Sequence, residues 1–320
     1  MKRGNIYFWF AAAVALMAIA GCAKTVHTPE NGEQPIGFNV QEPVKSAVTG
    51  AADIASFEVW GWYGSNTDRN KNVFNGTQVN KTGSGWVYDN IQYWVPDMNY
   101  TFYAVYPFGK GECSADGITV KDFNCSAFGD KAVDLMTAAR AVEEGSENFP
   151  KSVVFNFSHE LAKVKFTVKT ADPDGVAVSL LKLYGISAQG SLTKPQDGSA
   201  LWSLENAVGS DDTPYFVKEE VVLNTGNSYT AEPFGELLLP PHAALAEARL
   251  SFSYYYGSNS TQIKSADIPL AAGTGGITSW EAGKSYNYTV EIQANRDIKI
   301  NVTVTDWDER DTSVTWTPNN

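Results

Sequence analysis

Apolar and polar residues alternate with a period of two along much of the chain. From Ala162 to Lys169, apolar residues occupy the even positions, and lysine or threonine occupies the odd ones. The segments 248–256, 286–292 and 298–304 follow the same rule. Successive side chains of a strand point to opposite faces of a sheet, so this pattern predicts β-strands with one buried face.

Earlier segments also favour strands, because β-branched and aromatic residues fill them and Gly, Pro, Asn or Asp separate them. These segments are Ile36–Val40, Phe57–Tyr63, Trp86–Trp94, Tyr100–Tyr106 and Val153–Phe157. A turn or two of helix is expected only within Lys131–Glu144. Many short strands with turns between them predict an all-β fold of antiparallel β-sandwiches rather than a parallel α/β sheet.

The N-terminus has a different pattern. Lys2 and Arg3 precede the uncharged stretch Gly4–Gly21, whose centre is apolar and whose last residues are small. This order is typical of a secretory signal peptide, and a cysteine directly after it is typical of a bacterial lipoprotein, in which lipid is attached to that thiol. The alternative, an N-terminal membrane helix, requires a longer apolar run. We therefore expect an exported chain that begins at lipidated Cys22.

These features divide the chain into four predicted parts. The signal peptide covers residues 1–21, and a polar tether covers residues 22–34. A charged loop, Glu143–Pro150, then separates an N-terminal β-sandwich at 35–150 from a C-terminal β-sandwich at 151–320. The chain of 320 residues is long enough for two such domains.

Charge and cysteine content narrow the choice of function. With 24 basic and 36 acidic residues the net charge is −12, which disfavours binding to nucleic acid phosphates. Besides Cys22, the chain contains Cys113 and Cys125 in what we expect to be an oxidising compartment. They form either a disulfide that closes a short loop or two partly buried thiols, and both alternatives remain.

Motifs that would indicate a zinc-protease, phosphate-binding or calcium-binding site are all incomplete. His159–Lys163 resembles the start of a zinc-protease helix, but a lysine occupies the place of the second histidine. Gly283–Ser285 resembles the end of a phosphate-binding loop, but Thr278 stands where that loop needs glycine. The acidic turns at 172–175 and 306–311 lack the ligand spacing of known calcium loops. We predict no catalytic residue, no metal site and no cofactor.

Four tryptophans, Trp60, Trp62, Trp86 and Trp94, concentrate in the first predicted domain. If exposed, they would form a platform on which sugar rings stack, and if buried they would fill the core, as tryptophans more often do. A surface glycan-binding lipoprotein is therefore the alternative function.

Several short sequence segments occur along the mature chain in an order that resembles the fimbrillin family of Bacteroidetes, the lipoprotein pilins of fimbriae. Cys22 and the strand Ile36–Val40 come first. The later segments are Phe57–Tyr63, Tyr100–Pro107, Phe155–Val164, Leu237–Pro240, Trp280–Tyr286 and Val304–Trp307. The resemblance implies two tandem β-sandwiches of transthyretin-like or Greek-key type and a structural, non-enzymatic fimbrial subunit that supports adhesion.

The resemblance also implies an assembly route. Family pilins reach the outer membrane as lipoproteins, and a trypsin-like protease cuts them after the first strand, which a strand of the next subunit replaces. Here Ile36, Phe38 and Val40 would form the exchangeable strand, and Lys45 would be the cleavage site. The family is usually cut after Arg, so Lys45 departs from the pattern. If Lys45 is only a solvated loop charge, the subunit keeps its lipid as an anchor or tip.

Overall fold

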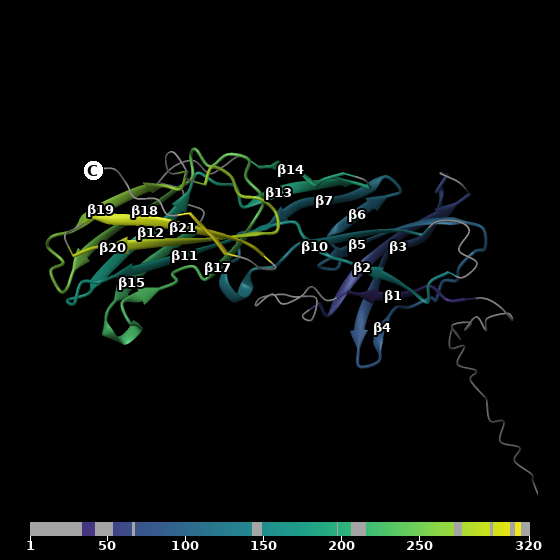
Figure 1. The fold of residues 1–320 in the computed structure, drawn as a ribbon, viewed down its shortest axis with the longest axis horizontal. Helices are drawn as coiled ribbons and strands as arrows, with labels where there is room; N and C mark the ends of the chain where they lie inside the picture. The colour runs from purple at the N-terminus through teal and green to yellow at the C-terminus, as the bar shows by residue number, and fades with distance from the viewer. Residues whose placement is uncertain are drawn as a thin grey trace, which may run out of the picture. The chain divides into compact units, whose positions relative to one another are not determined.

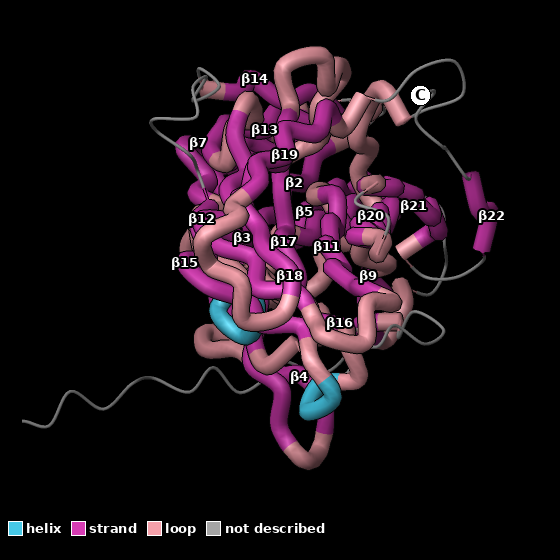
Figure 2. Tube along the Cα trace, turned by 90° about the vertical axis from the view of Figure 1, so that its left-hand side faces the viewer, coloured by secondary structure: helices cyan, strands magenta, loops and turns pink. Residues whose placement is uncertain are grey.

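The computed structural model describes residues 34–41, 54–65, 68–142, 149–196, 198–205, 216–271, 277–294 and 297–307, and the backbone of 311–314. The predicted signal peptide, Cys22 and Lys45 lie outside the described residues. In the described part every regular element is a strand, apart from the single 3-10 turns η2 (Gly129–Lys131) and η3 (Thr225–Asn227), drawn in cyan in Figure 2. The all-β expectation is therefore confirmed. No helix of these segments is long and apolar enough to cross a bilayer.

A six-stranded antiparallel sheet in the order β10-β8-β5-β2-β3-β4 forms the centre of the N-terminal half (Figure 1). Its strands are β2 (Ser56–Gly64), β3 (Lys71–Thr82), β4 (Gly85–Val87), β5 (Asn99–Tyr106), β8 (Met136–Val142) and β10 (Ser158–His159). Both faces of this sheet are covered. On β5, Tyr100 and Phe102 join one apolar cluster, whereas Tyr103 and Val105 join another.

A short parallel pair covers the first of these faces. It consists of β1 (Gly37–Val40) and β9 (Ser152–Phe155), whose side chains pack with Phe57, Phe74 and Phe102. The second face contacts a four-stranded sheet, β14-β13-β7-β6, through the cluster that Tyr103 and Val105 share with Val120 and Leu192. Its strands are β6 (Gly111–Ser114), β7 (Gly117–Asn124), β13 (Gln189–Pro195) and β14 (Leu201–Leu204).

The C-terminal half contains two further sheets. One has the order β16-β11-β20-β21-β22, with β17 also on β11, and the other has the order β15-β12-β18-β19. The first comprises β11 (Ala162–Thr170), β16 (Thr230–Ala231), β17 (Glu236–Leu239), β20 (Lys284–Ile292), β21 (Ile298–Asp306) and β22 (Asp311–Val314). The second comprises β12 (Val176–Tyr184), β15 (Phe216–Leu223), β18 (Arg249–Tyr256) and β19 (Lys264–Pro269). The alternation predicted for β11, β18, β20 and β21 is confirmed, and Val164, Phe166 and Val168 of β11 are fully buried.

Strands from before and after residue 150 pair with each other. β7 pairs antiparallel with β13, and the two lie side by side in Figure 1. β9 and β10, which follow residue 150, pair with β1 and β8. The division into domains at 35–150 and 151–320 stays a prediction, and sheet pairing in the structure crosses it.

Two local expectations were wrong. The described part of Lys131–Glu144, residues 131–142, is not helical, because Lys131 ends a single 3-10 turn and Met136–Val142 forms β8 along β5. Pairing in a buried sheet overrides the helix preference of its alanines. Trp86–Trp94 holds only the end of β4, followed by a loop in which Asn90 adopts a left-handed conformation. Two strand pairs, β1–β9 and β11–β20, are parallel rather than antiparallel.

Candidate functional site

The first strand inserts alternate side chains into the N-terminal half. Ile36, Phe38 and Val40 are 1%, 5% and 8% exposed, whereas Asn39 between them faces solvent. The period of two that predicted the strand thus places its three apolar side chains on one buried face. These are the residues predicted to form an exchangeable strand.

Backbone hydrogen bonds hold β1 along β9. The register runs in parallel from Gly37 opposite Ser152 to Val40 opposite Phe155, and the amide of Gln41 donates to the carbonyl of Phe155 at 3.0 Å. A Cβ atom at Gly37 would lie 2.6 Å from the carbonyl oxygen of Lys151, so only glycine allows this close approach.

The other side of β1 is held by the loop after β4. The amide of Ile36 donates to the carbonyl of Gln92 at 2.8 Å, and the hydroxyl of Tyr88 donates to the carbonyl of Ile36 at 2.6 Å. Among the described residues, β9 is the one strand that forms a ladder with β1. The strand is therefore fixed by one ladder and a few contacts to a loop.

Phe38 occupies the centre of an aromatic cluster. Its ring centroid lies 5.0 Å from that of Phe74, 5.3 Å from Tyr88 and 5.7 Å from Phe155. Aromatic rings at these distances pack favourably and contribute much of the buried area of a core. Removal of β1 would leave an apolar groove along β9 with free backbone donors and acceptors. Such a groove accepts an extended strand with apolar residues at alternate positions.

The two remaining cysteines are free thiols in the structure. Cys113 lies opposite Ile118 in the β6–β7 hairpin, and Cys125 comes seven positions after Ile118, just beyond the end of β7. At about 3.3 Å per residue this separates them by roughly 20 Å, whereas a disulfide requires Cα atoms within about 7 Å. Of the two alternatives, the structure shows unpaired thiols, and burial raises the pKa of both.

The four tryptophans do not form one platform. Trp60 and Trp62 are half-buried and stack on each other with centroids 6.5 Å apart, next to the cluster that contains Tyr103. Trp86 and Trp94 instead pack on the opposite face of the sheet, with Phe57 and Phe102 among their neighbours. The predicted alternative of a shared tryptophan surface for sugars is therefore not supported by their positions.

The His159 segment forms a buried polar network. The Nδ1 atom of His159 lies 2.6 Å from Oδ2 of Asp134, and its ring stacks on Trp307 with centroids 4.1 Å apart. The neighbouring Glu160 accepts hydrogen bonds from Thr137 at 2.5 Å and Lys194 at 2.6 Å. Burial is the main cause that raises the pKa of Asp134, and its contact with His159 acts in the opposite direction.

Sequence reasoning found the histidine but missed its partners, which lie 25 or more positions away in other strands or loops.

The remaining motifs form turns. Gly283, at φ 71°, precedes β20, and its amide donates to the carbonyl of Leu161 rather than opening a helix. The side chain of Asp172 accepts from the amide of Asp174 within a turn. Among the described residues no three His, Cys, Asp or Glu side chains cluster as metal ligands.

Comparisons with known proteins concern almost the whole described chain. A sequence model of a family, described as Fimbrillin-like, matches residues 47–307. No curated protein matches the chain.

Solved structures show a similar fold. A fimbrial protein from Bacteroides vulgatus is 16% identical with a TM-score of 0.59, and the match covers 86% of this chain and 99% of that protein. A proposed cell adhesion protein from Bacteroides uniformis is 20% identical with a TM-score of 0.53, and the match covers 88% of this chain and 100% of that one. A similar protein from Bacteroides ovatus is 18% identical with a TM-score of 0.53 and is covered to 99%, against 87% of this chain. At these identities the likeness concerns the fold.

Proposed function

Because this chain belongs to the fimbrillin-like family, which matches it over residues 47–307, we propose that it is a structural subunit of a cell-surface fimbrium that supports adhesion. Its partners are other fimbrial subunits, of its own kind or homologous. A structural role agrees with a site built from a docked strand and an aromatic groove rather than from reactive side chains.

The first strand is the observation that carries this proposal. Ile36, Phe38 and Val40 fill a groove made by other parts of the chain, and β9 is the one strand in the described part that pairs with β1. A strand from a neighbouring subunit with apolar residues at alternate positions fits the same ladder and the same pockets. A donor strand that lies outside the groove of its own subunit makes head-to-tail contacts, which continue into a filament rather than closing a dimer.

Export and processing complete the proposed route. The signal peptide at 1–21 directs export, Cys22 receives the lipid, and the lipoprotein is held at the outer membrane. A protease of trypsin-like specificity then cuts after Lys45, which follows β1 by a few residues. The cut frees β1 from the rest of the chain and opens its groove.

The same structure also accommodates an anchoring or tip subunit. Without cleavage, the chain keeps β1 in its own groove and its lipid at Cys22, and it ends or starts a filament rather than extending it. The fate of β1 therefore distinguishes a shaft subunit from an anchor or tip.

The test is the N-terminus of the protein in a fraction sheared from intact cells, determined by Edman sequencing or mass spectrometry. A shaft subunit is expected to begin at Ser46 in high-molecular-weight material. Lys45→Ala should keep the chain in the cell-bound fraction, starting at acylated Cys22. Lys24→Ala, which changes the other basic residue near the N-terminus of the mature chain, should leave processing unchanged.

Two results would contradict parts of the proposal. A wild-type chain that starts at acylated Cys22 and stays with the cell rules out a shaft subunit and leaves the anchor. A chain that is absent from all fimbrial fractions, in cells that make fimbriae, overturns the structural role itself.

A further inference from the structure

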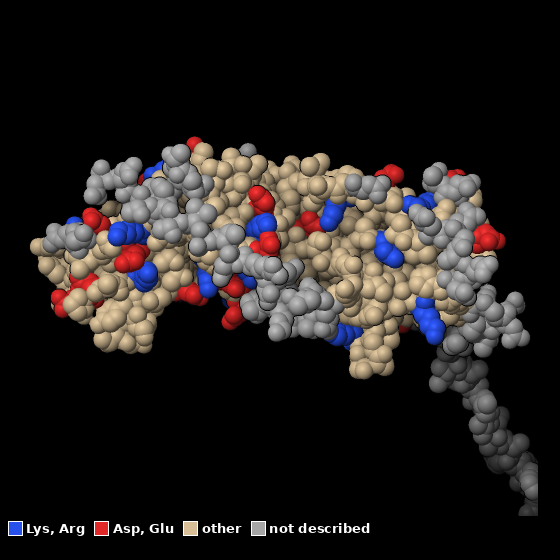
Figure 3. Space-filling view, viewed as in Figure 1, with Lys and Arg blue, Asp and Glu red and all other residues tan. Residues whose placement is uncertain are grey.

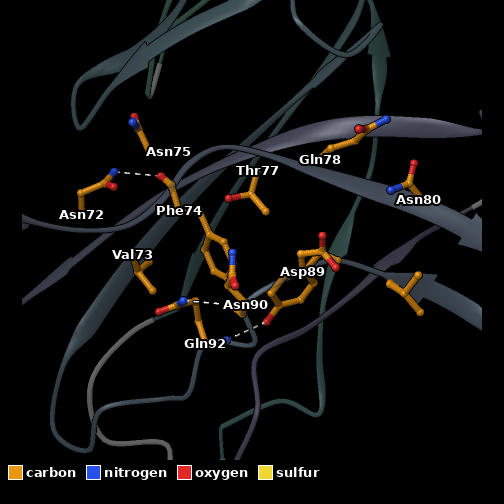
Figure 4. Close-up of a pocket in the computed structure, with 12 residues that line it drawn as sticks. Asn72, Val73, Phe74, Asn75, Thr77, Gln78, Asn80, Asp89, Asn90 and Gln92 are labelled. Atoms are coloured by element: carbon orange, nitrogen blue, oxygen red, sulfur yellow. Dashed lines mark hydrogen bonds between the residues drawn. The ribbon is translucent and has the colours of Figure 1, made fainter. Parts of the chain in front are cut away.

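A second groove lies beside the first strand, between β3 and the loop that follows β4 (Figure 4). Its volume is about 640 Å³. In Figure 4, Asn75, Gln78 and Asn80 lie along one side, and Asn90 and Gln92 lie along the other. The lining is completed by Asn72, Val73, Phe74, Thr77, Val87, Tyr88 and Asp89.

Side-chain amides dominate this lining. Six of the twelve lining residues are Asn or Gln, Asp89 is the one charged residue, and no lysine or arginine takes part. An amide offers both a hydrogen-bond donor and an acceptor, as does a hydroxyl group. A surface of this kind matches a ligand that carries many uncharged hydroxyl groups. It offers no cation to neutralise a phosphate, sulfate or carboxylate.

Five of the six amides fall into two groups. Asn75, Gln78 and Asn80 are exposed, and their side chains have no hydrogen-bond partner within the part of the chain that the structure describes. Asn72 and Gln92 are instead fixed by the protein. The Nδ2 atom of Asn72 donates to the carbonyls of Gly61 and Phe74, and Nε2 of Gln92 donates to the carbonyl of Asn90 at 2.8 Å. Fixed groups lose little entropy when a ligand binds.

Aromatic rings lie beneath the amides. Tyr88 is half-buried at the groove and packs on the buried ring of Phe74, with ring centroids 5.3 Å apart. Phe74 lies between the two rows of polar side chains in Figure 4. Aromatic surfaces pack against apolar atoms of a ligand, whereas neighbouring polar groups fix its orientation. A sugar ring presents both kinds of surface, with C–H groups on its faces and hydroxyl groups around its edge.

From this combination we propose that the groove between β3 and the loop 88–92 is a binding site for an uncharged oligosaccharide. The exposed amides hydrogen-bond its hydroxyl groups, and the half-buried ring of Tyr88 contacts its apolar side. The proposal goes beyond the fimbrial role, and saccharide binding by the single chain does not depend on assembly.

The groove is coupled to the first strand through shared residues. Tyr88 donates its hydroxyl hydrogen to the carbonyl of Ile36 and accepts from the amide of Gln92 at 3.3 Å. Phe38 packs against both Phe74 and Tyr88 from the opposite side. Any strand that occupies the place of β1 therefore supports the base of the saccharide groove. Loosening that strand should weaken saccharide binding without touching a groove residue.

The test uses the mature chain from Ala23 and a defined panel of oligosaccharides at millimolar concentrations. The panel contains uncharged hexasaccharides of glucose, mannose, xylose and galactose, with sialyllactose and heparin hexasaccharide as charged controls. Binding is measured by isothermal titration calorimetry. The groove variant is the double change Asn75→Ala with Gln78→Ala, and Gln262→Ala, an exposed amide remote from this lining, is the matched control.

At least one uncharged hexasaccharide should bind the wild-type chain and the Gln262→Ala control equally. The double variant should bind it at least about tenfold more weakly, as expected when two hydrogen bonds are lost. Phe38→Leu, which lies outside the groove, should weaken binding severalfold.

The proposal is overturned if no uncharged member binds, if only the charged controls bind, or if the double variant binds as well as Gln262→Ala does. Because Asn75, Gln78 and Gln262 are exposed, the double variant and the control keep their fold, which circular dichroism checks. Failure of this test leaves the fimbrial role intact, because the N-terminus in sheared material reports on that role separately.

Discussion

Glu58 shows how one buried carboxylate holds a loop of this protein. The residue lies on β2 and is 2% exposed. Its Oε1 atom accepts hydrogen bonds from the amides of Lys110, at 3.0 Å, and Gly111. These two amides lie where β6 begins, and each backbone amide needs an acceptor. Burial nonetheless raises the pKa of Glu58, because the cost of burying a charge exceeds the effect of its donors.

Replacement of Glu58 by alanine should destabilise the chain by about 1–3 kcal/mol, because two backbone amides lose their buried acceptor. Glu58→Gln keeps an acceptor oxygen at the same place and should cost little. Urea unfolding at pH 7 measures both. Equal losses for the two variants would show that the amides do not depend on this oxygen.

The raised pKa of Glu58 makes the stability of the folded chain depend on pH. A carboxyl whose pKa is higher in the folded state contributes most stability below its unfolded value of 4.5, and that contribution falls as pH rises through the folded value. Glutamine does not titrate. The stability of Glu58→Gln relative to wild type should therefore increase between pH 4.5 and pH 7, and a constant difference would argue against a shifted pKa.

At the scale of elements, β1 is a short strand that is held in place mainly by the packing of its side chains. It pairs with one strand, yet Phe38 contacts aromatic residues of four other segments, namely Phe74, Tyr88, Phe102 and Phe155. Most of its docking free energy should therefore come from burial of apolar surface rather than from the ladder. A docking free energy dominated by apolar burial is expected of a strand that can be replaced by another strand with apolar residues at alternate positions.

Phe38→Ala should lower the free energy of unfolding by about 3–5 kcal/mol, the usual cost of truncating a buried phenylalanine. Gln41→Ala, an exposed change at the end of the same strand, should have little effect. Hydrogen exchange should also show faster exchange in β9 for Phe38→Ala, because β1 leaves its ladder more often. Unchanged exchange in β9 would mean that β1 stays docked without its central ring.

At the scale of the whole molecule, strand pairing joins residues that are far apart in sequence. β7 pairs with β13, and Lys194 at the end of β13 reaches Glu160 next to β10 at 2.6 Å. The N-terminal sheets are completed by strands that follow residue 150, and the described chain from Gln34 forms one compact unit. Charged side chains of both signs are interspersed on the face shown in Figure 3, as suits an exported surface protein.

A fragment of residues 34–150 should fail to fold cooperatively, because it lacks the strands that pair with β1, β7 and β8 in the full chain. The chain from residue 34 to 320 should instead unfold in urea with one steep transition. Tryptophan fluorescence and far-UV circular dichroism follow both. A sharp, reversible transition of the 34–150 fragment would support the boundary predicted from sequence.

Individual residues show why prediction succeeded in some places and failed in others. Val164 and Phe166 could be assigned to a buried face because alternation is a local property of strands. Met136–Val142 could not be assigned, since pairing with β5 rather than local preference decides its structure. The partner of His159, and the meeting of Asn75 with Asn90 and Gln92 across a groove, depend on contacts between separate segments.

The sequence alone determined that the chain is built of strands, which faces of its longest strands are buried, and that Ile36–Val40 is a strand with an apolar side. These properties follow from the alternation of side chains and from turn residues, both of which act over a few positions. Only the tertiary structure decided which strands pair, that β1 lies parallel to β9, that the cysteines are apart, and that amides gather above Phe74 and Tyr88. Those outcomes depend on long-range packing, in which each segment takes the place where its apolar face is covered and its backbone is hydrogen-bonded.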